Sequence, residues 1–414
     1  MTFPVGSRKL HPEPNFNFQL NRLALWNGGD WDELTEAAKH ISTAADWERE
    51  ILALGEKALK DGRTQNAAGY FRMAEFFMYD GNPEKLNIYL KAKELFNQMN
   101  ASAFESGEVG RERVPYMDAY LPVWVALPKG DVKDTILMHG GFDSYIEEFF
   151  PVVRYLAKNG CAVYLFEGPG QGEALRVGNL KFTHEWHKPV SAILDFFGLH
   201  DVTLVGISLG GVLAPRAAAL EKRIRRVVGF SILPSLFDVF LSKQSSIIRG
   251  SISNLLAFRQ KWLLNIIVKK KLARNPMLEW QLNHAMYAFG ATSIYDLLCE
   301  LKKYQIADIG RLIDQDFLLI GASEDHFIPA SLYKDEIDAL QGVRSLTYRL
   351  FTEQENAGTH CSIGNTKLVL DFIDNWIASV KQPKGDGSCV TPVTPTSAQT
   401  PDPPKGDGSC VTQG

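Results

Sequence analysis

Apolar residues recur three and four positions apart through most of the chain from about Asp30 to Asn100. Such spacing is typical of amphipathic helices, and Pro83 stands where the first turn of a helix tolerates proline. We therefore predict an N-terminal helical domain over residues 1–108. Its clearest segments read DWDELTEAAKHI, ADWEREILALGEKALKDG, NAAGYFRMAEFFMYDG and NPEKLNIYLKAKELFNQM.

The stretch GYFRMAEFFMY at residues 69–79 is densely aromatic. Large aromatic side chains at helical spacing most often fill a core, and this is the simpler interpretation. The alternative is that Tyr70 and Phe76 line one side of a substrate pocket. The pattern alone leaves both interpretations open.

After residue 110 the pattern changes to short apolar runs that alternate with helical segments. This alternation is typical of a mostly parallel, doubly wound sheet, although the first two runs, split by MDAY, predict an antiparallel hairpin. We expect an α/β core in two parts, residues 109–233 and 312–381. Its eight predicted strands read ERVPY, LPVWVALP, DTILMHG, CAVYLFEG, VTLVGIS, RRVVGFSI, QDFLLIGA and SLTYRLF.

About 80 residues with strong helical patterning separate the strand that ends near Ile232 from the one that begins near Asp316. An interval of this size is too long for a plain connection. We predict a helical lid over residues 234–311, above the carboxyl ends of the strands, where open α/β sheets keep their sites. The lysines at 269–271 are expected to form a solvated helix end rather than an anion-binding patch.

The composition and net charge indicate which kinds of molecule the protein binds. Of the 414 residues 45% are hydrophobic, and the formal net charge is only −4, so no overall basic field attracts nucleic acid or anionic lipid. We expect a small-molecule substrate, no nucleic acid and no membrane. The N-terminus lacks an apolar signal region and the run WLLNIIV is too short to span a bilayer, so a cytoplasmic location is the default.

The five cysteines show no CxxC spacing, so neither a disulfide framework nor a zinc site is expected, and no cofactor is indicated. The segment 382–414 contains PKGDGSCVT twice, joined by a spacer rich in Pro, Thr and Ser. Its apolar content is too low to offset the entropy of ordering, so we expect disorder there. The helical domain could serve as the surface of a homodimer.

The sequence GISLG, residues 206–210, places a serine between glycines. The strand VTLV runs directly into it and a helix follows, so Ser208 lies on a strand-to-helix turn. Such a turn crowds the backbone and needs small residues two before and two after a nucleophile. GxSxG alone is a weak motif, but this context makes Ser208 a strong candidate nucleophile.

A nucleophilic serine needs a histidine base and a carboxylate that orients it. In chains built on this turn the order is serine, acid, histidine, each after a later strand. Asp325 follows FLLIGA and His360 follows SLTYRLF, so both places are filled. Glu324 or Asp316 could instead supply the acid, and His326 could be the base, although we favour His326 as a pocket residue.

Two backbone donors should stabilise the oxyanion. One is the N–H of Leu209, directly after the nucleophile, and the other should come from HGGFDSY at residues 139–145, where Gly141 or Phe142 would donate. His139 is expected to be structural. The glycine-rich loop FEGPGQGEA does not have the GxGxxG spacing, and Glu167 would repel a phosphate, so dinucleotide binding has little support.

Together, HGGFDSYIEEFFPVVRYLAKNG, FEGPGQG and GISLGG resemble the α/β-hydrolase superfamily over about residues 15–380. The likeness is to a two-domain branch with an N-terminal helical domain. That branch includes 2,6-dihydroxypseudooxynicotine hydrolase, esterases related to fermentation-respiration switch proteins, and fungal hydrolases that trim or release polyketide products.

The resemblance implies a Ser208–His360–Asp325 hydrolase that cleaves an ester, or a carbon–carbon bond beside a carbonyl, in a bulky aromatic or polyketide compound. It also suggests a role in fungal secondary metabolism. The alternative on the same fold is a ring-closing or product-release enzyme, or a ligand-binding protein, in which the serine forms no covalent bond.

Overall fold

The computed structural model describes residues 2–272 and 275–381, so the predicted disordered segment 382–414 lies outside the described residues. Eight strands form one sheet in the order β1-β2-β4-β3-β5-β6-β7-β8. The strands are β1 (Gly110–Tyr116), β2 (Ala119–Ala126), β3 (Asp134–His139), β4 (Cys161–Phe166), β5 (Val202–Ile207), β6 (Ile224–Phe230), β7 (Asp316–Ala322) and β8 (Ser345–Phe351).

The predicted strand directions are confirmed. β1 and β2 form an antiparallel hairpin and β2 is antiparallel to β4, whereas the strands from β4 to β8 in the sheet order are parallel. Successive side chains of a strand face opposite sides, so Leu204 and Val205 enter two separate cores. The sheet is therefore buried on both faces, as its near-continuous apolar strands require.

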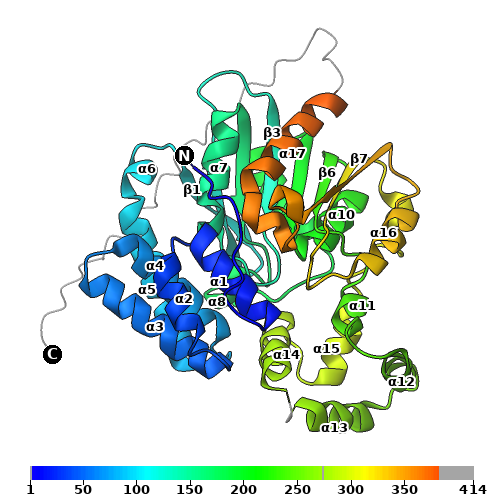
Figure 1. The fold of residues 1–414 in the computed structure, drawn as a ribbon. Helices are drawn as coiled ribbons and strands as arrows, with labels where there is room; N and C mark the ends of the chain where they lie inside the picture. Colours follow the sequence, from blue (N-terminus) through cyan, green and yellow to red (C-terminus); the bar gives the residue numbers. More distant parts are fainter. Residues whose placement is uncertain (1, 273–274, 382–414) are drawn as a thin grey trace, which may run out of the picture.

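Helices cover the two faces of the sheet (Figure 1). α9 and α10 contribute to the core on one face, and α7 and α17 contribute to the core on the other. The core helices are α7 (Phe150–Lys158), α8 (Gly172–Arg176), α9 (His187–Phe197), α10 (Gly210–Leu220), α16 (Tyr333–Ala339) and α17 (Thr366–Val380).

The N-terminal helices have a core of their own, centred on Trp47, Tyr70 and Phe71. They lie together beside the sheet in Figure 1. They are α1 (Pro14–Trp26), α2 (Trp31–Ala38), α3 (Ala44–Lys60), α4 (Thr64–Ala74), α5 (Pro83–Met99) and α6 (Ala101–Glu105).

Helix α1 was not predicted, because the helical pattern was expected to begin only near Asp30. Pro14 stands in its first turn and the Glu13 side chain caps it by accepting from the Phe16 N–H. α1 joins the two parts of the molecule, because Leu20 packs in the helical-domain core and Phe18 packs with the sheet.

The N-terminal segment also meets the C-terminal part of the core. The indole N–H of Trp26 donates to Thr366 Oγ1 at 3.0 Å, and the Gly6 N–H donates to the Gly364 carbonyl at 2.8 Å. These contacts place α1 beside the short helix η6 (His360–Asn365). The segment just before α17 is thereby fixed from both sides.

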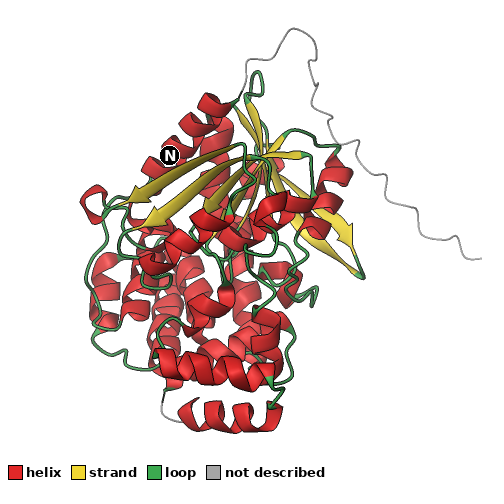
Figure 2. Cartoon of the chain, turned by 90° about the vertical axis from the view of Figure 1, so that its right-hand side faces the viewer, coloured by secondary structure: helices red, strands yellow, loops and turns green. Residues whose placement is uncertain are grey.

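Five α-helices are described in the interval between β6 and β7, where a helical lid is predicted. They are α11 (Leu236–Leu241), α12 (Ser246–Ala257), α13 (Lys261–Leu272), α14 (Pro276–Phe289) and α15 (Ile294–Leu301). α14 contacts the helical domain through Trp280, whereas α12 and α13 lie at the edge of the molecule away from the sheet (Figures 1 and 2). Within the described ranges, no helix has the length and apolar character needed to cross a membrane.

Candidate active site

Ser208 lies on the predicted turn between β5 and α10, with a φ of 59°. This left-handed conformation is unusual for a residue with a side chain, and it projects the hydroxyl out of the turn. A β-carbon on Gly206 would collide with the carbonyl oxygen of Gly210, which explains why glycine precedes the serine by two positions. The local geometry is that of a nucleophile elbow.

A continuous hydrogen-bonded chain begins at this serine. Ser208 Oγ lies 2.9 Å from His360 Nε2, and His360 Nδ1 lies 2.7 Å from Asp325 Oδ2. The other carboxylate oxygen, Asp325 Oδ1, accepts from the backbone N–H groups of Phe327 at 2.9 Å and Ile328 at 3.0 Å. The loop after β7 thus fixes the carboxylate, and the carboxylate in turn orients the imidazole.

The electrostatics suit proton transfer from the serine. Burial disfavours charge on both partners, yet the carboxylate of Asp325 raises the pKa of His360 well above its ordinary value of 6.5. Burial also opposes ionisation of Asp325, but His360 and the two backbone donors keep the pKa of that carboxyl below 3.8. The pair is therefore arranged to stabilise an imidazolium next to Ser208.

The alternative acids and base lie elsewhere. Asp316 begins β7, at the strand end remote from the turn, where it pairs with Arg344 and accepts from Ser345. Glu324 is exposed. Burial lowers the pKa of His326 to about 3, so its imidazole is neutral, and its Nε2 has no hydrogen-bond partner among the described residues. None of these side chains replaces a member of the Ser208 chain.

The loop after β3 lies against the serine turn, as the oxyanion prediction requires. A β-carbon on Gly141 would lie 2.6 Å from that of Ser208 and 2.9 Å from the Leu209 nitrogen. The Gly141 N–H donates to Ser144 Oγ at 2.9 Å. No described residue accepts from the backbone N–H of Phe142 or Leu209, so these two donors are free for a ligand.

The loop after β4 holds the loop after β3 in place. Gln171 Nε2 donates to the carbonyl oxygens of Gly140 at 2.7 Å and Gly141 at 3.0 Å. His139 Nε2 accepts from the indole of Trp186 at 3.1 Å, so Nδ1 carries the proton and donates to the Gly140 carbonyl at 2.9 Å. His139 is fully buried and burial lowers its pKa to about 4, which fits the predicted structural role.

A cavity of about 230 Å³ opens beside Ser208 and His360. Its walls come from α1, the loop after β3, the lid helices α11 and α14, and the loops after β7 and β8. Besides Ser208 and His360, the polar side chains of the lining are fewer and comprise Asn15, Gln19, Arg22, Asp143, Ser144, Lys243 and Gln281. Aromatic side chains dominate the walls: Phe18, Trp26, Phe76, Phe142, Phe149, Phe240, Trp280, Phe289 and Phe327.

Of the three predicted pocket residues, Tyr70, Phe76 and His326, only Phe76 lines this cavity. Phe76 lines it and stacks on Trp280 of the lid with ring centroids 5.3 Å apart. Tyr70 does not line it, because its fully buried ring packs in the helical-domain core and its hydroxyl donates to Glu33 at 2.7 Å. His326 also lies outside the lining and contacts the ring of Phe18.

Sequence reasoning missed the residues of α1 that line the cavity. Asn15, Gln19, Arg22 and Trp26 recur three and four positions apart, on one face of the helix. The available signal was the proline-led segment PNFNFQLNRLALW, but its asparagines weaken the apolar periodicity.

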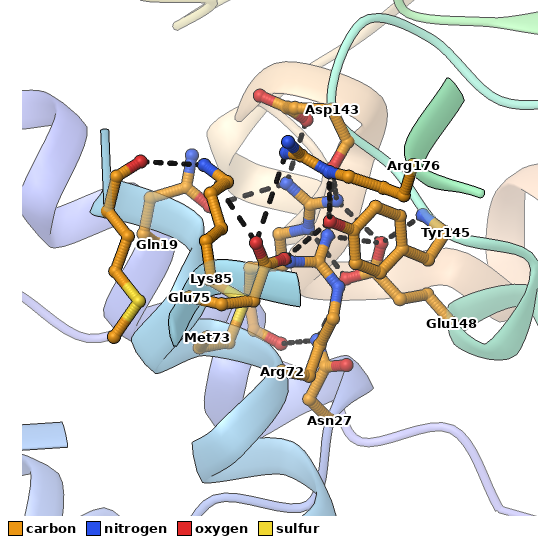
Figure 3. A network of polar contacts seen from close by, with 12 residues as sticks. Gln19, Asn27, Arg72, Met73, Glu75, Lys85, Asp143, Tyr145, Glu148 and Arg176 are labelled. Carbon is orange, nitrogen blue, oxygen red and sulfur yellow. Dashed lines mark hydrogen bonds and ion pairs between the residues drawn. The ribbon is translucent and has the colours of Figure 1, made fainter. Parts of the chain in front are cut away.

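Behind the cavity lies a buried network of charges (Figure 3). Arg22 binds both carboxylate oxygens of Glu148, at 3.0 and 2.6 Å, and reaches Asp143 at 3.0 Å. Arg72 donates to the Asp143 carbonyl at 2.8 Å and to Glu75 at 3.2 Å. Helices α1 and α4 thereby hold the loop that follows Phe142.

The same network reaches the lid. Arg176 donates to Asp80, and His284 of α14 lies 2.9 Å from the same carboxylate. Tyr145 donates to Glu75 at 2.5 Å, close to Arg176 in Figure 3. The charges join helical domain, core and lid at one point next to the cavity.

The pKa values in this network follow from pairing. Burial raises the pKa of Glu148, but the charges of Arg22 and Arg72 outweigh it and bring that pKa down to about 2. Burial and the nearby Arg176 lower the pKa of Lys85 to about 8. In the described part of the chain, no group of three or more His, Cys, Asp or Glu side chains is arranged to hold a metal ion.

Several curated proteins match most of the chain. Hydrolase acrC of Aspergillus aculeatus is 28% identical over 408 residues, which cover 86% of this chain and 94% of that protein. The 20-hydroxy-prefusarin hydrolase FUS2 of Gibberella moniliformis is 28% identical over 385 residues, covering 86% of this chain and 88% of that protein.

Solved structures agree on the fold. AbyA5 gives a TM-score of 0.62 at 17% identity, covering 84% of this chain and 90% of the other. The 2,6-dihydroxy-pseudo-oxynicotine hydrolase gives 0.58 at 20% identity, covering 87% and 95%. A model of the Alpha/beta hydrolase family matches residues 135–366, more than half of the chain, and the chain therefore belongs to the α/β-hydrolase family.

Proposed function

We propose that this protein is a metal-independent serine hydrolase that acts on a bulky, largely apolar carbonyl compound. The observation that carries the proposal is the unbroken chain from Ser208 Oγ through His360 to Asp325 in the wall of an aromatic cavity. A binding protein has no need of a serine hydrogen-bonded to an imidazole that is itself held by a buried carboxylate.

In the proposed reaction, Ser208 Oγ attacks the substrate carbonyl carbon while its proton passes to His360 Nε2. The tetrahedral intermediate collapses when the imidazolium returns that proton to the leaving oxygen or carbon, which leaves an acyl group on Ser208. A water molecule, deprotonated by His360, then cleaves the acyl-enzyme and restores the serine. Asp325 stays ionised throughout and stabilises the imidazolium.

The negative charge on the substrate oxygen would be met by the free N–H groups of Leu209 and Phe142. Leu209 directly precedes α10, so the helix dipole adds to the stabilisation. Gly141 is less suited as a donor in this geometry, because its N–H is already bound to Ser144. Each such donor contributes on the order of 10²- to 10³-fold to the rate.

The walls of the cavity and the names of the relatives support a proposal for the substrate class. Aromatic and aliphatic side chains make up most of the walls, and a few amide and charged side chains lie among them, so a large apolar body with a few polar groups fits best. One relative is named as a hydrolase of 20-hydroxy-prefusarin. We propose a comparable product of fungal secondary metabolism, either an aromatic or a polyketide ester or a ketone cleaved beside its carbonyl.

The test is intact-mass analysis after exposure to a fluorophosphonate, with Ser208→Ala and His360→Ala run in parallel. A single adduct on the unaltered protein, absent from both variants, is expected. Ser144→Ala is the matched control, because Ser144 also lines the cavity and its variant should keep the adduct. With an ester substrate, Ser208→Ala should lose about 10⁴- to 10⁶-fold in turnover.

If the folded protein formed no adduct, Ser208 would not be an activated nucleophile and the hydrolase proposal would be wrong. The ring-closing or ligand-binding alternative would then be pursued by searching for compounds that bind the cavity without being cleaved. An adduct combined with a cyclised, rather than hydrolysed, product would retain Ser208 but assign the second step to a hydroxyl of the substrate.

A further inference from the structure

The outer part of the lid has a charge pattern unlike the rest of the chain. Between Asp238 and Glu279 there is no acidic residue, although the whole chain carries a formal net charge of −4. The basic residues in this interval are Lys243, Arg249, Arg259, Lys261, Lys269, Lys270, Lys271 and Arg274. Lys261 pairs with Asp296, but Arg249, Arg259 and Lys269 form no ion pair with any described acidic side chain.

The same segment exposes large apolar side chains. Ile247 of α12 is 79% exposed, Phe258 at the end of α12 is 73% exposed, and Trp262 in the first turn of α13 is 76% exposed. We call these three side chains, with Arg249 and Arg259, the lid tip. Largely exposed Trp and Phe side chains beside unpaired cations are unusual for a surface that meets only water.

We propose that the lid tip docks on an anionic lipid surface. Aromatic and aliphatic side chains that protrude singly can enter the interfacial region of a bilayer, whereas a protein helix is bound by a concave groove. The unpaired cations would meet the negative lipid headgroups. Expectations from the net charge of the whole chain do not extend to this segment, because the acidic residues lie outside it.

A second copy of the chain fits this surface less well. A two-fold dimer would bring two lid tips face to face, and Arg249 and Arg259 of each copy would then approach cations of like charge. The helices α12 and α13 lie at the edge of the molecule away from the sheet in Figures 1 and 2, so the exposed side chains of the lid tip are accessible to a flat surface.

Docking in this place would have a consequence for the site. Lys243, between α11 and α12, lines the cavity, as do Leu236, Val239 and Phe240 of α11. The lid therefore connects the docking surface to the cavity wall. An apolar substrate dissolved in a membrane would be concentrated at this side of the protein.

The inference does not rest on the proposed hydrolysis, and its test does not use activity. The full-length protein is mixed with vesicles of phosphatidylcholine alone, or with about 30 mol% phosphatidylserine, and bound protein is measured by flotation. We expect binding only to the anionic vesicles, with loss of binding as NaCl rises from about 0.1 to about 1 M.

Two double variants separate the contributions. Phe258→Ser with Trp262→Ser and, separately, Arg249→Gln with Arg259→Gln should each lower the partition coefficient about 10-fold or more. Phe196→Ser is the matched control, because Phe196 is 47% exposed on α9 and lies outside the lid, and it should bind as the unaltered protein does. Melting temperatures, measured by circular dichroism, should stay unchanged since the altered side chains are exposed.

Equal binding to both vesicle types, or unchanged binding of both double variants, would overturn the proposal. Light scattering provides a further check: a dimer that dissociates in the Phe258→Ser, Trp262→Ser variant would assign the lid tip to a second copy instead. No binding to anionic vesicles, together with saturable binding to an acidic polypeptide such as polyglutamate, would assign it to an acidic protein partner and would also overturn the proposal.

Discussion

At the scale of single residues, Gln171 joins the two glycine-rich loops of the site. Its Nε2 holds the carbonyl oxygens of Gly140 and Gly141, and its Oε1 accepts from the Gly168 N–H at 2.9 Å. In a trans peptide the C=O and the following N–H point in opposite directions, so a fixed Gly141 carbonyl also fixes the N–H of Phe142. In the proposed mechanism Gln171 is therefore a positioning residue for one oxyanion donor.

Gln171→Met should lower kcat about 10- to 100-fold while KM changes little, because a misoriented donor affects the transition state more than the bound substrate. A boronic acid that mimics the tetrahedral intermediate should lose affinity in parallel. Gln315→Met is the matched control, since Gln315 is also buried and donates to the Ala218 carbonyl at 2.8 Å. A similar loss of kcat in both variants would reduce Gln171 to a structural role.

The pH dependence of catalysis tests the His360–Asp325 pair. Since the carboxylate raises the pKa of His360 and only neutral imidazole accepts the serine proton, kcat/KM should rise with pH and reach half its maximum above pH 6.5. In Asp325→Asn the residual activity, about 10⁴-fold lower, should reach half maximum at a lower pH. The measurement is kcat/KM for a soluble aryl ester from about pH 5 to 9, and an unshifted profile would contradict the pairing.

The positions of Ser208, Asp325 and His360 could be predicted because each lies in the loop or turn that follows a strand with a clear apolar pattern. The choice between Gly141 and Phe142 could not, because it depends on where the Ser144 hydroxyl points. The contact of Gln171 could not be predicted either: it lies 30 positions after Gly141, and only the sheet order brings β3 and β4 side by side.

At the scale of elements, the N-terminal helical domain has two roles: some of its side chains line the cavity, and others form the domain's own core. Phe76, just after α4, faces the cavity, whereas Tyr70 in α4 binds Glu33 and accepts from the Asp30 N–H at 3.0 Å. Two aromatic residues only six positions apart thus have different roles. The aromatic pattern could not distinguish them, because both side chains are buried and differ only in which neighbouring element they meet.

A pair of conservative variants tests this division. Phe76→Leu should change KM for a bulky substrate several-fold with a small effect on stability, because it removes a ring that stacks on Trp280. Tyr70→Phe should leave KM unchanged but cost about 1 to 3 kcal/mol, because Glu33 loses one of its donors and the Asp30 N–H loses its acceptor. Steady-state kinetics and urea unfolding of both variants give the comparison. If Phe76→Leu lowered the unfolding free energy and left KM unchanged, Phe76 would be a core residue and not part of the substrate pocket.

At the scale of the whole molecule, a buried ionic junction connects parts that the sequence treats as separate. Arg22 and Arg72 come from the helical domain, and Glu148 comes from the sheet domain. The sequence predicted both domains but not their junction, because single charged residues in three different elements carry no periodic signal. Buried pairs of this kind are costly to break, since the remaining charge stays unpaired.

Acid should therefore weaken the structure through Glu148. Its pKa is about 2 in the folded protein against 4.5 in the unfolded chain, so its stabilising contribution is present above pH 4.5 and disappears as the pH falls toward 2. Glu148→Gln should cost about 3 to 5 kcal/mol at neutral pH and should reduce the dependence of unfolding free energy on pH below 4.5. Urea unfolding at several pH values measures both effects.

The exposed Glu324 offers the matched control for this experiment. Glu324→Gln should leave both the unfolding free energy and its pH dependence unchanged within error. If Glu148→Gln behaved in the same way, the ion pairs of Glu148 with Arg22 and Arg72 would contribute nothing to stability.

The hydrogen bond between Trp26 and Thr366 has a consequence for biosynthesis. Its two residues are 340 positions apart, so a ribosome that adds about 5 to 20 residues per second needs roughly 20 to 70 s between them. During that time the face of α1 that carries Phe18 lacks its ring contacts with Phe327 and His360, although Leu20 can already pack in the helical-domain core. Nascent chains would therefore leave one apolar face of the first helix exposed until translation is nearly complete, and chaperone binding should concentrate there.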